Sequence, residues 1–187
     1  KYVVMLDPGH GKDTPGKRSF DQSFFEYEFN RDMSKRIGNY LRAKGIQVKE
    51  TVTADLHDTP LSERVAISNK SDADLFVSIH SNAFGNTWNN ARGWEIYCYK
   101  KNSHGGRLAK AIHDANIPEV GLLDRGIKET NSPGLYVIRN ATKPAVLIEH
   151  GFFSNIEELK KLKDPAFRDK MARLDAKGIC NFLGIAW

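Results

Sequence analysis

The sequence has no apolar segment long enough to cross a lipid bilayer. Its apolar runs are short, as in AVLI at residues 145–148, whereas a membrane-spanning helix needs about 20 apolar residues. No basic stretch followed by an apolar one opens the chain, so we expect no signal peptide in it. Internal repeats and low-complexity tracts are also missing. We therefore expect one domain over residues 1–187, with no membrane span.

Cysteine is scarce as well. Cys98 and Cys180 are the only two, and they lie far apart without a CxxC pair. This pattern indicates neither a disulfide framework nor a thiolate metal site. Because Cys98 falls in a strand-like apolar run and Cys180 in a helical one, we expect both to be buried free thiols.

Neither positive nor negative residues are in large excess. The chain has 28 Lys and Arg against 23 Asp and Glu, a net charge of +5, and an isoelectric point near 9.1. This balance favours an anionic partner, such as an anionic polymer or a cell-envelope surface, although solubility alone also explains it. Basic residues alternate with acidic ones and form no arginine–aromatic stripe, so we expect no binding to nucleic acid.

The apolar pattern that is present predicts strands alternating with helices. Predicted strands cover residues 2–7, 46–52, 75–80, 94–100, 135–139 and 145–150. Predicted helices cover residues 25–45, 61–71, 104–116, 154–162 (with Ser154 as candidate N-cap) and 165–184. Alternation of this kind, with several continuously apolar strands, predicts an α/β sandwich around a largely parallel sheet.

Residues 9–19, GHGKDTPGKRS, are close to a phosphate-binding loop but do not fit one. Pro15 removes a backbone N–H from the middle of the loop, and Arg18 stands where a hydroxyl should hold magnesium. The helix that should follow at once is delayed by SFDQSFF. These departures disfavour a nucleotide site, which a nucleotide titration would exclude, and we expect Lys17 and Arg18 to be exposed near the mouth of another site.

Polar side chains follow the predicted strands at the edge where ligands bind in such sheets. Asp7 and His10 follow the first strand, His80 ends the third, and Glu149 ends the last. Any one of them is compatible with a structural role, but their shared edge favours a metal site. His150 follows Glu149 directly and therefore points to the opposite face of its strand.

A catalytic zinc site uses His and carboxylate ligands, so a carboxylate is needed beside the histidines. In the helix predicted from residue 25, Glu26 falls inside the apolar arc of Phe29 and Met33, whereas Glu28 falls outside it. A buried carboxylate must be paired or bind a metal. Glu26 is therefore the better candidate, with Asn30 one turn away to support it, although pairing with an arginine would also explain it.

Three other histidines carry little functional signal. His57 and His104 are predicted to lie in loops, and His113 on the surface or packing face of a helix.

Five motifs together resemble the zinc-dependent N-acetylmuramoyl-L-alanine amidases of the amidase_3 family, which include bacterial autolysins and phage endolysins. They are LDPGHG, EYEFN, ADLFVSIHSNA, RGIKE and PAVLIEHGFFSN, in the family's order, and the resemblance runs from Val3 to about Phe182. It implies a mixed sheet of about six strands flanked by helices. The sequence differs from many members at Lys12 and His150.

The resemblance also implies chemistry. The zinc ligands would be His10, Glu26 and His80, and the catalytic residue Glu149. Zn²⁺ would be the cofactor and peptidoglycan the partner. The bond cut would join the lactyl group of N-acetylmuramic acid to L-alanine of the stem peptide.

Three further residues are candidates for supporting roles. Asp7 is expected to orient a ligand imidazole or to cap a turn, and Asn82 or Arg139 to assist the oxyanion. Alternatives are another zinc hydrolase of the wall, such as a carboxypeptidase or deacetylase, and a non-catalytic peptidoglycan-binding module. We expect a monomer that acts on the cell wall, either secreted or periplasmic, or released by a phage from the host cytoplasm.

Overall fold

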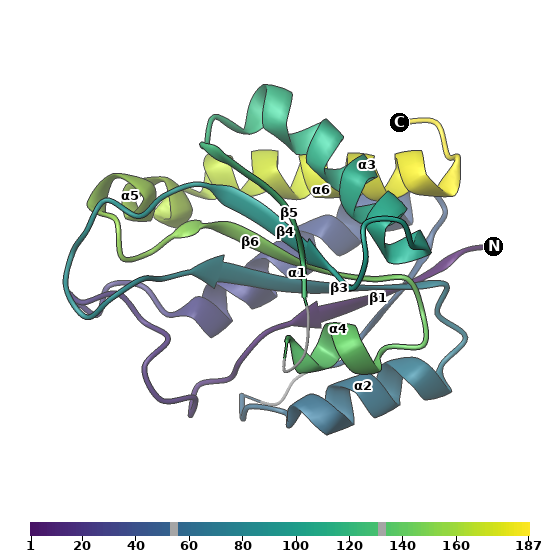
Figure 1. The fold of residues 1–187 in the computed structure, drawn as a ribbon, viewed down its shortest axis with the longest axis horizontal. Coiled ribbons are helices and arrows are strands. Elements are labelled where there is room, and N and C mark those ends of the chain that lie inside the picture. The colour runs from purple at the N-terminus through teal and green to yellow at the C-terminus, as the bar shows by residue number, and fades with distance from the viewer. Residues whose placement is uncertain (53–55, 131–133) are drawn as a thin grey trace.

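A computed structural model describes residues 1–52, 56–130 and 134–187. Within these residues, six strands form one mixed sheet in the order β2-β1-β3-β6-β4-β5 (Figure 1). Neighbouring strands are parallel except for β4 and β6, which are antiparallel. The strands are β1 (Val3–Pro8), β2 (Gln47–Glu50), β3 (Leu75–Asn82), β4 (Trp94–Cys98), β5 (Asp124–Glu129) and β6 (Ala145–Phe152).

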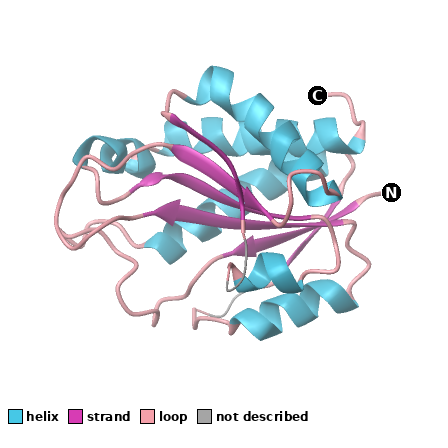
Figure 2. Cartoon of the chain, in the orientation of Figure 1, coloured by secondary structure: helices cyan, strands magenta, loops and turns pink. Residues whose placement is uncertain are grey.

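Helices cover both faces of the sheet (Figure 2). They are α1 (Glu26–Ala43), α2 (Leu61–Lys70), α3 (His104–Val120), α4 (Tyr136–Asn140), α5 (Ile156–Lys163) and α6 (Pro165–Leu183). The larger apolar core lies between the sheet and α1, α3 and α6, and a smaller one lies under α2 and α4 (Figure 1). No helix in the described ranges is both long and apolar enough to cross a membrane.

Strand β6 shows how side chains are divided between the two faces. Val146 and Ile148 pack in the larger core, whereas Leu147 packs in the smaller one. Because side chains alternate along a strand, Glu149 lies on the face of Leu147, and His150 on the face of Ile148. Glu149 therefore lies on the face of the sheet that α2 and α4 cover.

One predicted strand was wrong, and one strand was missed. The segment 135–139, expected as a strand, contains most of helix α4, with Val137 and Ile138 buried in the smaller core. Both flanks of β6 are already occupied by β3 and β4, so the segment cannot pair with the strand that follows it in the chain. Strand β5 was missed because it is an edge strand with only Ile127 packed against the core, and an edge strand needs few apolar residues.

The remaining predictions hold with small shifts of boundary. Asn155, not Ser154, caps α5: its side chain accepts hydrogen bonds from the backbone N–H groups of Glu157 and Glu158. Ser154 is buried, and its hydroxyl instead accepts a hydrogen bond from the backbone N–H of Phe84. The cysteine prediction is confirmed, since Cys98 and Cys180 are both buried and free.

Candidate metal centre

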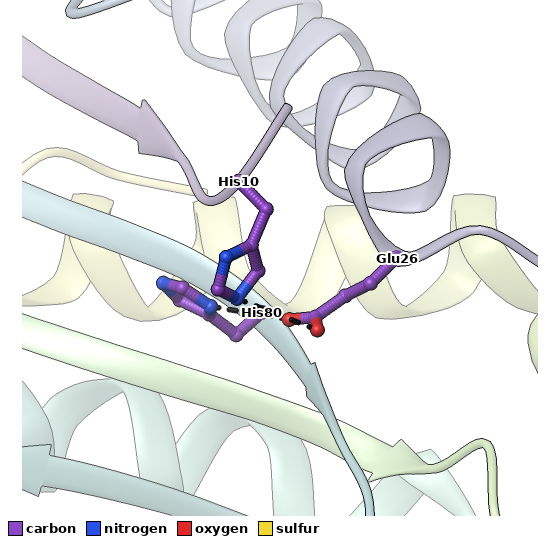
Figure 3. Close-up of side chains that lie close together, drawn as sticks. All are labelled: His10, Glu26 and His80. Carbon is purple, nitrogen blue, oxygen red and sulfur yellow. Dashed lines mark hydrogen bonds and ion pairs between the residues drawn. The ribbon is translucent and has the colours of Figure 1, made fainter. Parts of the chain in front are cut away.

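Three side chains from separate elements converge on one point (Figure 3). His10 follows β1, Glu26 is the first residue of α1, and His80 lies in β3. His10 Nε2 is 3.5 Å from Glu26 Oε2, and His80 Nδ1 is 3.2 Å from Glu26 Oε1. One potential ligand atom from each residue lies within 4.8 Å of the other two. Tertiary structure thus brings together the three residues named from the sequence.

The close approach of His10 to His80 depends on the glycine between β1 and His10. A Cβ atom at Gly9 would stand 2.1 Å from the ring carbon Cε1 of His80, so no other residue fits there. His10 itself has a φ of 64°, in the left-handed region that non-glycine residues seldom adopt. Strain of this kind persists only where the surroundings hold the backbone in place.

The buried side chain of Arg64, on α2, holds that backbone. It is 1% exposed and donates hydrogen bonds to the carbonyl oxygens of Pro8 (2.7 Å) and His10 (3.2 Å). It also pairs with the carboxylates of Asp7 (2.9 Å) and Asp58 (3.0 Å). The guanidinium thus fastens the turn that carries His10 to the helix packed beneath it.

The ring of His80 is oriented by a chain of hydrogen bonds. The Ser78 hydroxyl donates its hydrogen to Asp7 Oδ2 at 2.6 Å and lies 3.0 Å from His80 Nε2. Because the hydroxyl has only one hydrogen, it must accept from Nε2–H. That tautomer leaves a lone pair on Nδ1, the atom that faces Glu26. Asp7 therefore acts on His80 through Ser78, rather than on its sequence neighbour His10.

Glu26 is 2% exposed, whereas Glu28 is exposed, as the helical periodicity predicted. Glu26 Oε1 accepts a hydrogen bond from the backbone N–H of Ser81 at 3.3 Å, and the side-chain amide nitrogen of Asn30 lies 3.5 Å from the same oxygen. In the metal-free protein, burial raises the pKa of Glu26, but a protonated His80 ring, which would donate from Nδ1 to Glu26 Oε1, outweighs burial together with smaller contributions from His10 and Lys17, and the pKa is lowered overall. Glu26 is therefore an anion poised between two imidazoles.

Burial is also the main effect on His10, whose pKa it lowers despite the opposing attraction of Glu26. A lowered pKa keeps the imidazole neutral, and a metal ion binds only a neutral imidazole.

Glu149 lies beside this cluster in a different environment. Strands β3 and β6 place it level with His80, and β4 and β6 place it directly opposite Glu95. Its Oε2 is buried and has no hydrogen-bond partner in the described part of the chain. Burial, followed by the negative charges of Glu26 and Glu95, raises the pKa of Glu149 well above its ordinary value. Glu149 therefore combines a buried, unpaired oxygen with a strong tendency to hold a proton.

Glu95 is kept ionised by its own partners. Lys128 and Arg125, both on the edge strand β5, contact Glu95 Oε2 at 2.7 Å and 2.9 Å. Burial raises the pKa of Glu95, but these two cations outweigh it, and the pKa is lowered overall.

Two clefts meet at the cluster. One, of about 540 Å³, extends toward α2 and α4 and has apolar walls that include Leu61, Leu135 and Tyr136. The other, of about 490 Å³, is lined by polar and basic groups that include Arg18 and Asn86. Residues common to both clefts are His10, Lys17, His80 and Glu149. A ligand at the cluster can thus extend in two directions.

A sequence model of the family described as N-acetylmuramoyl-L-alanine amidase matches residues 4–181. The chain belongs to this amidase family. The resemblance seen in the motifs is confirmed, and so is the predicted mixed, largely parallel sheet flanked by helices.

Relatives of this chain occur in bacteria and in a phage. The chain is 33% identical over 185 residues to the N-acetylmuramoyl-L-alanine amidase LytC of Bacillus subtilis, covering 96% of this chain and 35% of LytC. It is 33% identical over 190 residues to the endolysin of Bacillus phage SPP1, covering 98% of this chain and 66% of the endolysin. The chain thus spans about a third of the length of LytC.

A solved structure with the same fold is the catalytic domain of the amidase CwlV from Bacillus (Paenibacillus) polymyxa var. colistinus. Its TM-score against this chain is 0.89 at 33% sequence identity, with both chains fully covered.

The two candidate oxyanion donors, Asn82 and Arg139, differ in whether they line a cleft. Asn82 lines the polar cleft, but its Nδ2 donates to Glu95 Oε1 at 2.8 Å. Arg139 is exposed on α4 and does not line either cleft within the described residues. Asn82 is thus at the site, whereas Arg139 lies outside the described walls.

Histidines outside the cluster have other partners. His57 is exposed and contacts Asp13 at 3.0 Å, whereas His113, predicted as a helical residue, lies on α3 beside Asp124. His104 begins α3 and was wrongly expected in a loop. Lys17 and Arg18 are exposed and line the polar cleft, as predicted, and no helix follows them until Glu26.

Sequence reasoning missed two residues that support the site, Arg64 and Ser78. Arg64 lies next to Val65 and four residues before Ser68, on the buried face of α2, so helical periodicity could have found it. Ser78 lies two residues before His80, on the same face of β3, and strand periodicity could have found it.

Proposed function

We propose that this chain is a zinc-dependent peptidoglycan hydrolase, with His10, Glu26 and His80 as the zinc ligands and Glu149 as the catalytic base. It cleaves the amide between the lactyl group of N-acetylmuramic acid and L-alanine of the stem peptide. The observation that carries the proposal is an open His–Glu–His cluster at the junction of two clefts, with an unpaired carboxylate oxygen beside it. Membership of the amidase family supports the choice of bond.

The donor set fits zinc. In the neutral tautomer that Ser78 selects, the lone pair of His80 Nδ1 faces the anionic Oε1 of Glu26 at 3.2 Å, and a cation bound between these two acceptors would satisfy both. Ligand atoms about 2.0–2.1 Å from a tetrahedral zinc ion lie about 3.3–3.4 Å from each other. The contacts with Glu26 are of that order, 3.2 Å from His80 Nδ1 to Oε1 and 3.5 Å from His10 Nε2 to Oε2, and one ligand atom from each of the three residues lies within 4.8 Å of the other two. Two neutral imidazoles and one carboxylate also form the ligand set of a catalytic site with its fourth position open to water.

Zinc held there would supply a Lewis acid that activates water and polarises the scissile carbonyl. Glu149 takes a proton from the attacking water and delivers it to the departing nitrogen of L-alanine. Glu149 must be ionised before it accepts this proton, and the positive charge of bound zinc would favour the ionised form over the raised pKa of the metal-free protein. Ser78 and Asp7 keep the His80 ring in the tautomer that a metal needs, and Arg64 holds the turn carrying His10.

The two clefts suit a substrate with groups on both sides of the cleaved bond. The glycan strand lies on one side of the lactyl–alanine amide and the stem peptide on the other, and each needs its own path from the cluster. The site of action is therefore the cell wall, whether the enzyme serves a bacterium or a phage. Residues 1–187 would act as the catalytic domain, as a monomer.

Turbidity of a purified peptidoglycan suspension tests the proposal. We expect clearing that stops with a chelator, returns with added zinc, and produces new L-alanine amino termini without new reducing ends. Clearing that persists in chelator would contradict the zinc assignment. New reducing ends would indicate a glycosidase instead.

The same experiment separates the remaining hypotheses. A wall carboxypeptidase would release a free C-terminal amino acid, and a deacetylase would release acetate. A non-catalytic module would sediment with the peptidoglycan and clear nothing, with or without zinc. The unpaired oxygen of Glu149 argues for an enzyme, because binding alone has no use for a base.

A further inference from the structure

His150 lies behind the metal cluster, on the opposite face of β6 from Glu149. Its side chain is completely buried, and so is that of Asp175 on α6. His150 Nε2 lies 2.6 Å from Asp175 Oδ2, and His150 Nδ1 lies 2.9 Å from the backbone carbonyl oxygen of His80. Because a carbonyl can only accept, Nδ1 carries a hydrogen and donates it. One ring thus joins a core helix to the backbone of a metal-cluster residue.

This contact falls where the pairing of β3 and β6 changes register. His80 is level with Glu149, but Asn82 is level with Phe152, so β6 has one more residue than β3 between these pairs. Gly151, within this interval, has a φ of 91°, which favours glycine. Irregularities of this kind aim side chains near active sites. Here His80 and Glu149 form the last regular pair before the irregularity, so the irregularity directly adjoins both residues.

The pair is anchored on two further helices. Asp175 Oδ1 accepts a hydrogen bond from Asn116 Nδ2 on α3 at 3.0 Å. The ring of His150 packs against Phe29 on α1, with ring centroids 5.9 Å apart and planes at 64°. Phe29 lies about one turn beyond Glu26 on the same helix. Movement of the His150 ring is therefore opposed from α1, α3 and α6 together.

Stability alone does not account for this arrangement. Removing two ionisable groups from water costs more than their attraction usually returns, and apolar residues of similar volume often serve a core equally well. A buried polar pair is instead suited to hold one specific geometry. The geometry in question is the β3–β6 irregularity beside the metal cluster.

We propose that His150 and Asp175 are positioning residues that hold the β3–β6 irregularity and thereby set His80 and Glu149 in place for metal binding and catalysis. Neither residue reaches the clefts, so both act through the His80 backbone. The proposal rests on the proposed function, because it takes His80 as a zinc ligand and Glu149 as the base.

The test compares His150→Leu with His150→Asn and Asp175→Asn. Leucine fills much of the space but donates nothing, whereas asparagine keeps an N–H near the position of Nδ1. Leu174→Ala is the matched control, because Leu174 is buried beside Asp175 on α6 and touches no cluster residue through a hydrogen bond. Each variant is compared by melting temperature, zinc affinity in chelator competition, the absorption spectrum of bound Co²⁺, and kcat and KM.

We expect His150→Leu to weaken zinc binding about 10- to 100-fold, as loss of a partner that orients a ligand does. The Co²⁺ spectrum should shift and kcat should fall, while KM changes little. His150→Asn should recover most of the zinc affinity, and Asp175→Asn should fall between the two. Leu174→Ala should lower the melting temperature but leave the spectrum and the zinc affinity of the folded protein unchanged.

Two outcomes would overturn the proposal. One is a folded His150→Leu variant with the zinc affinity and Co²⁺ spectrum of the wild type. The other is a loss of zinc affinity in Leu174→Ala equal to that in His150→Leu. Zinc affinity and the Co²⁺ spectrum are measured without substrate. If the wild-type chain cleaves no peptidoglycan while these readouts still separate the variants, the proposed function fails and the positioning role stands.

Discussion

Two buried carboxylates of the same chemical type, Glu26 and Glu149, lie near one point but in opposite surroundings. Glu26 faces two imidazoles, and its pKa is lowered. Glu149 faces the carboxylates of Glu26 and Glu95, and its pKa is raised well above the ordinary value. Neighbouring charges, and not residue type, therefore set the two pKa values: in the metal-free protein Glu26 favours its ionised form and Glu149 its protonated form.

The strongest test of this comparison is Glu26→Gln, which keeps the shape of the side chain and removes its charge. We expect the variant to lose stoichiometric zinc and, with it, activity down to background, because two imidazoles alone make a weak zinc site. Metal content by atomic absorption after gel filtration measures the first effect, and peptidoglycan clearing the second. Full zinc occupancy in a folded variant would rule out Glu26 as a ligand.

Glu149→Gln should have the opposite pattern. Zinc content should stay at the wild-type level, while kcat falls about 10²- to 10⁴-fold, the usual loss when a general acid–base group is removed. Steady-state kinetics on solubilised peptidoglycan and the same metal analysis give both values. An active Glu149→Gln variant would show that another group accepts the proton.

A smaller effect is expected from Ser78→Ala, which removes the link between Asp7 and His80. The ring of His80 then loses the partner that selects its tautomer. We expect zinc affinity to fall about 10- to 100-fold in chelator competition. Ser78→Thr keeps the hydroxyl and is the matched control. Equal affinities for the alanine and threonine variants would contradict the role of this hydrogen bond.

The smallest effect concerns the stability of the metal-free protein as a function of pH. A lowered folded-state pKa means that Glu26 stabilises the fold above the pKa of an unfolded glutamate, about 4.3. A raised folded-state pKa means that Glu149 destabilises the fold increasingly as pH rises from the pKa of an unfolded glutamate toward the folded-state pKa of Glu149. At neutral pH, Glu26→Gln should therefore melt below the wild type and Glu149→Gln above it.

Thermal scans with chelator at pH 4 and pH 7 measure this contrast. Both differences should shrink at pH 4, where unfolded glutamates are largely protonated. Shifts of the same sign in the two variants at pH 7 would mean that the two carboxylates do not differ as described.

Much of the site could be predicted from the sequence because it depends on local periodicity. A helix repeats every 3.6 residues, so Glu26 and Glu28 point in different directions whatever else the chain does. A strand alternates, so Glu149 and His150 must lie on opposite faces. Both expectations agree with the structure.

Edge strand β5 and helix α4 could not be predicted in the same way. The segment 124–129 reads as polar, and it becomes a strand only because β4 offers a free edge to pair with. The segment 135–139 reads as a strand, but it folds as a helix because no strand partner remains beside β6. In both cases the strands available for pairing decide whether the segment becomes a strand, and the local sequence pattern carries no information about those distant strands.

For this protein, then, local patterns in the sequence were enough to place His80 and Glu149 near the carboxyl ends of their strands and to choose the glutamate that faces inward, since backbone geometry repeats over a few residues. Tertiary structure alone decided the contacts between distant segments. Arg64 under the His10 turn, the Asp7–Ser78–His80 chain, and the placement of Glu95 opposite Glu149 all require strands and helices to be packed first. Those contacts set the charges and hydrogen bonds around each group, and hence its chemistry.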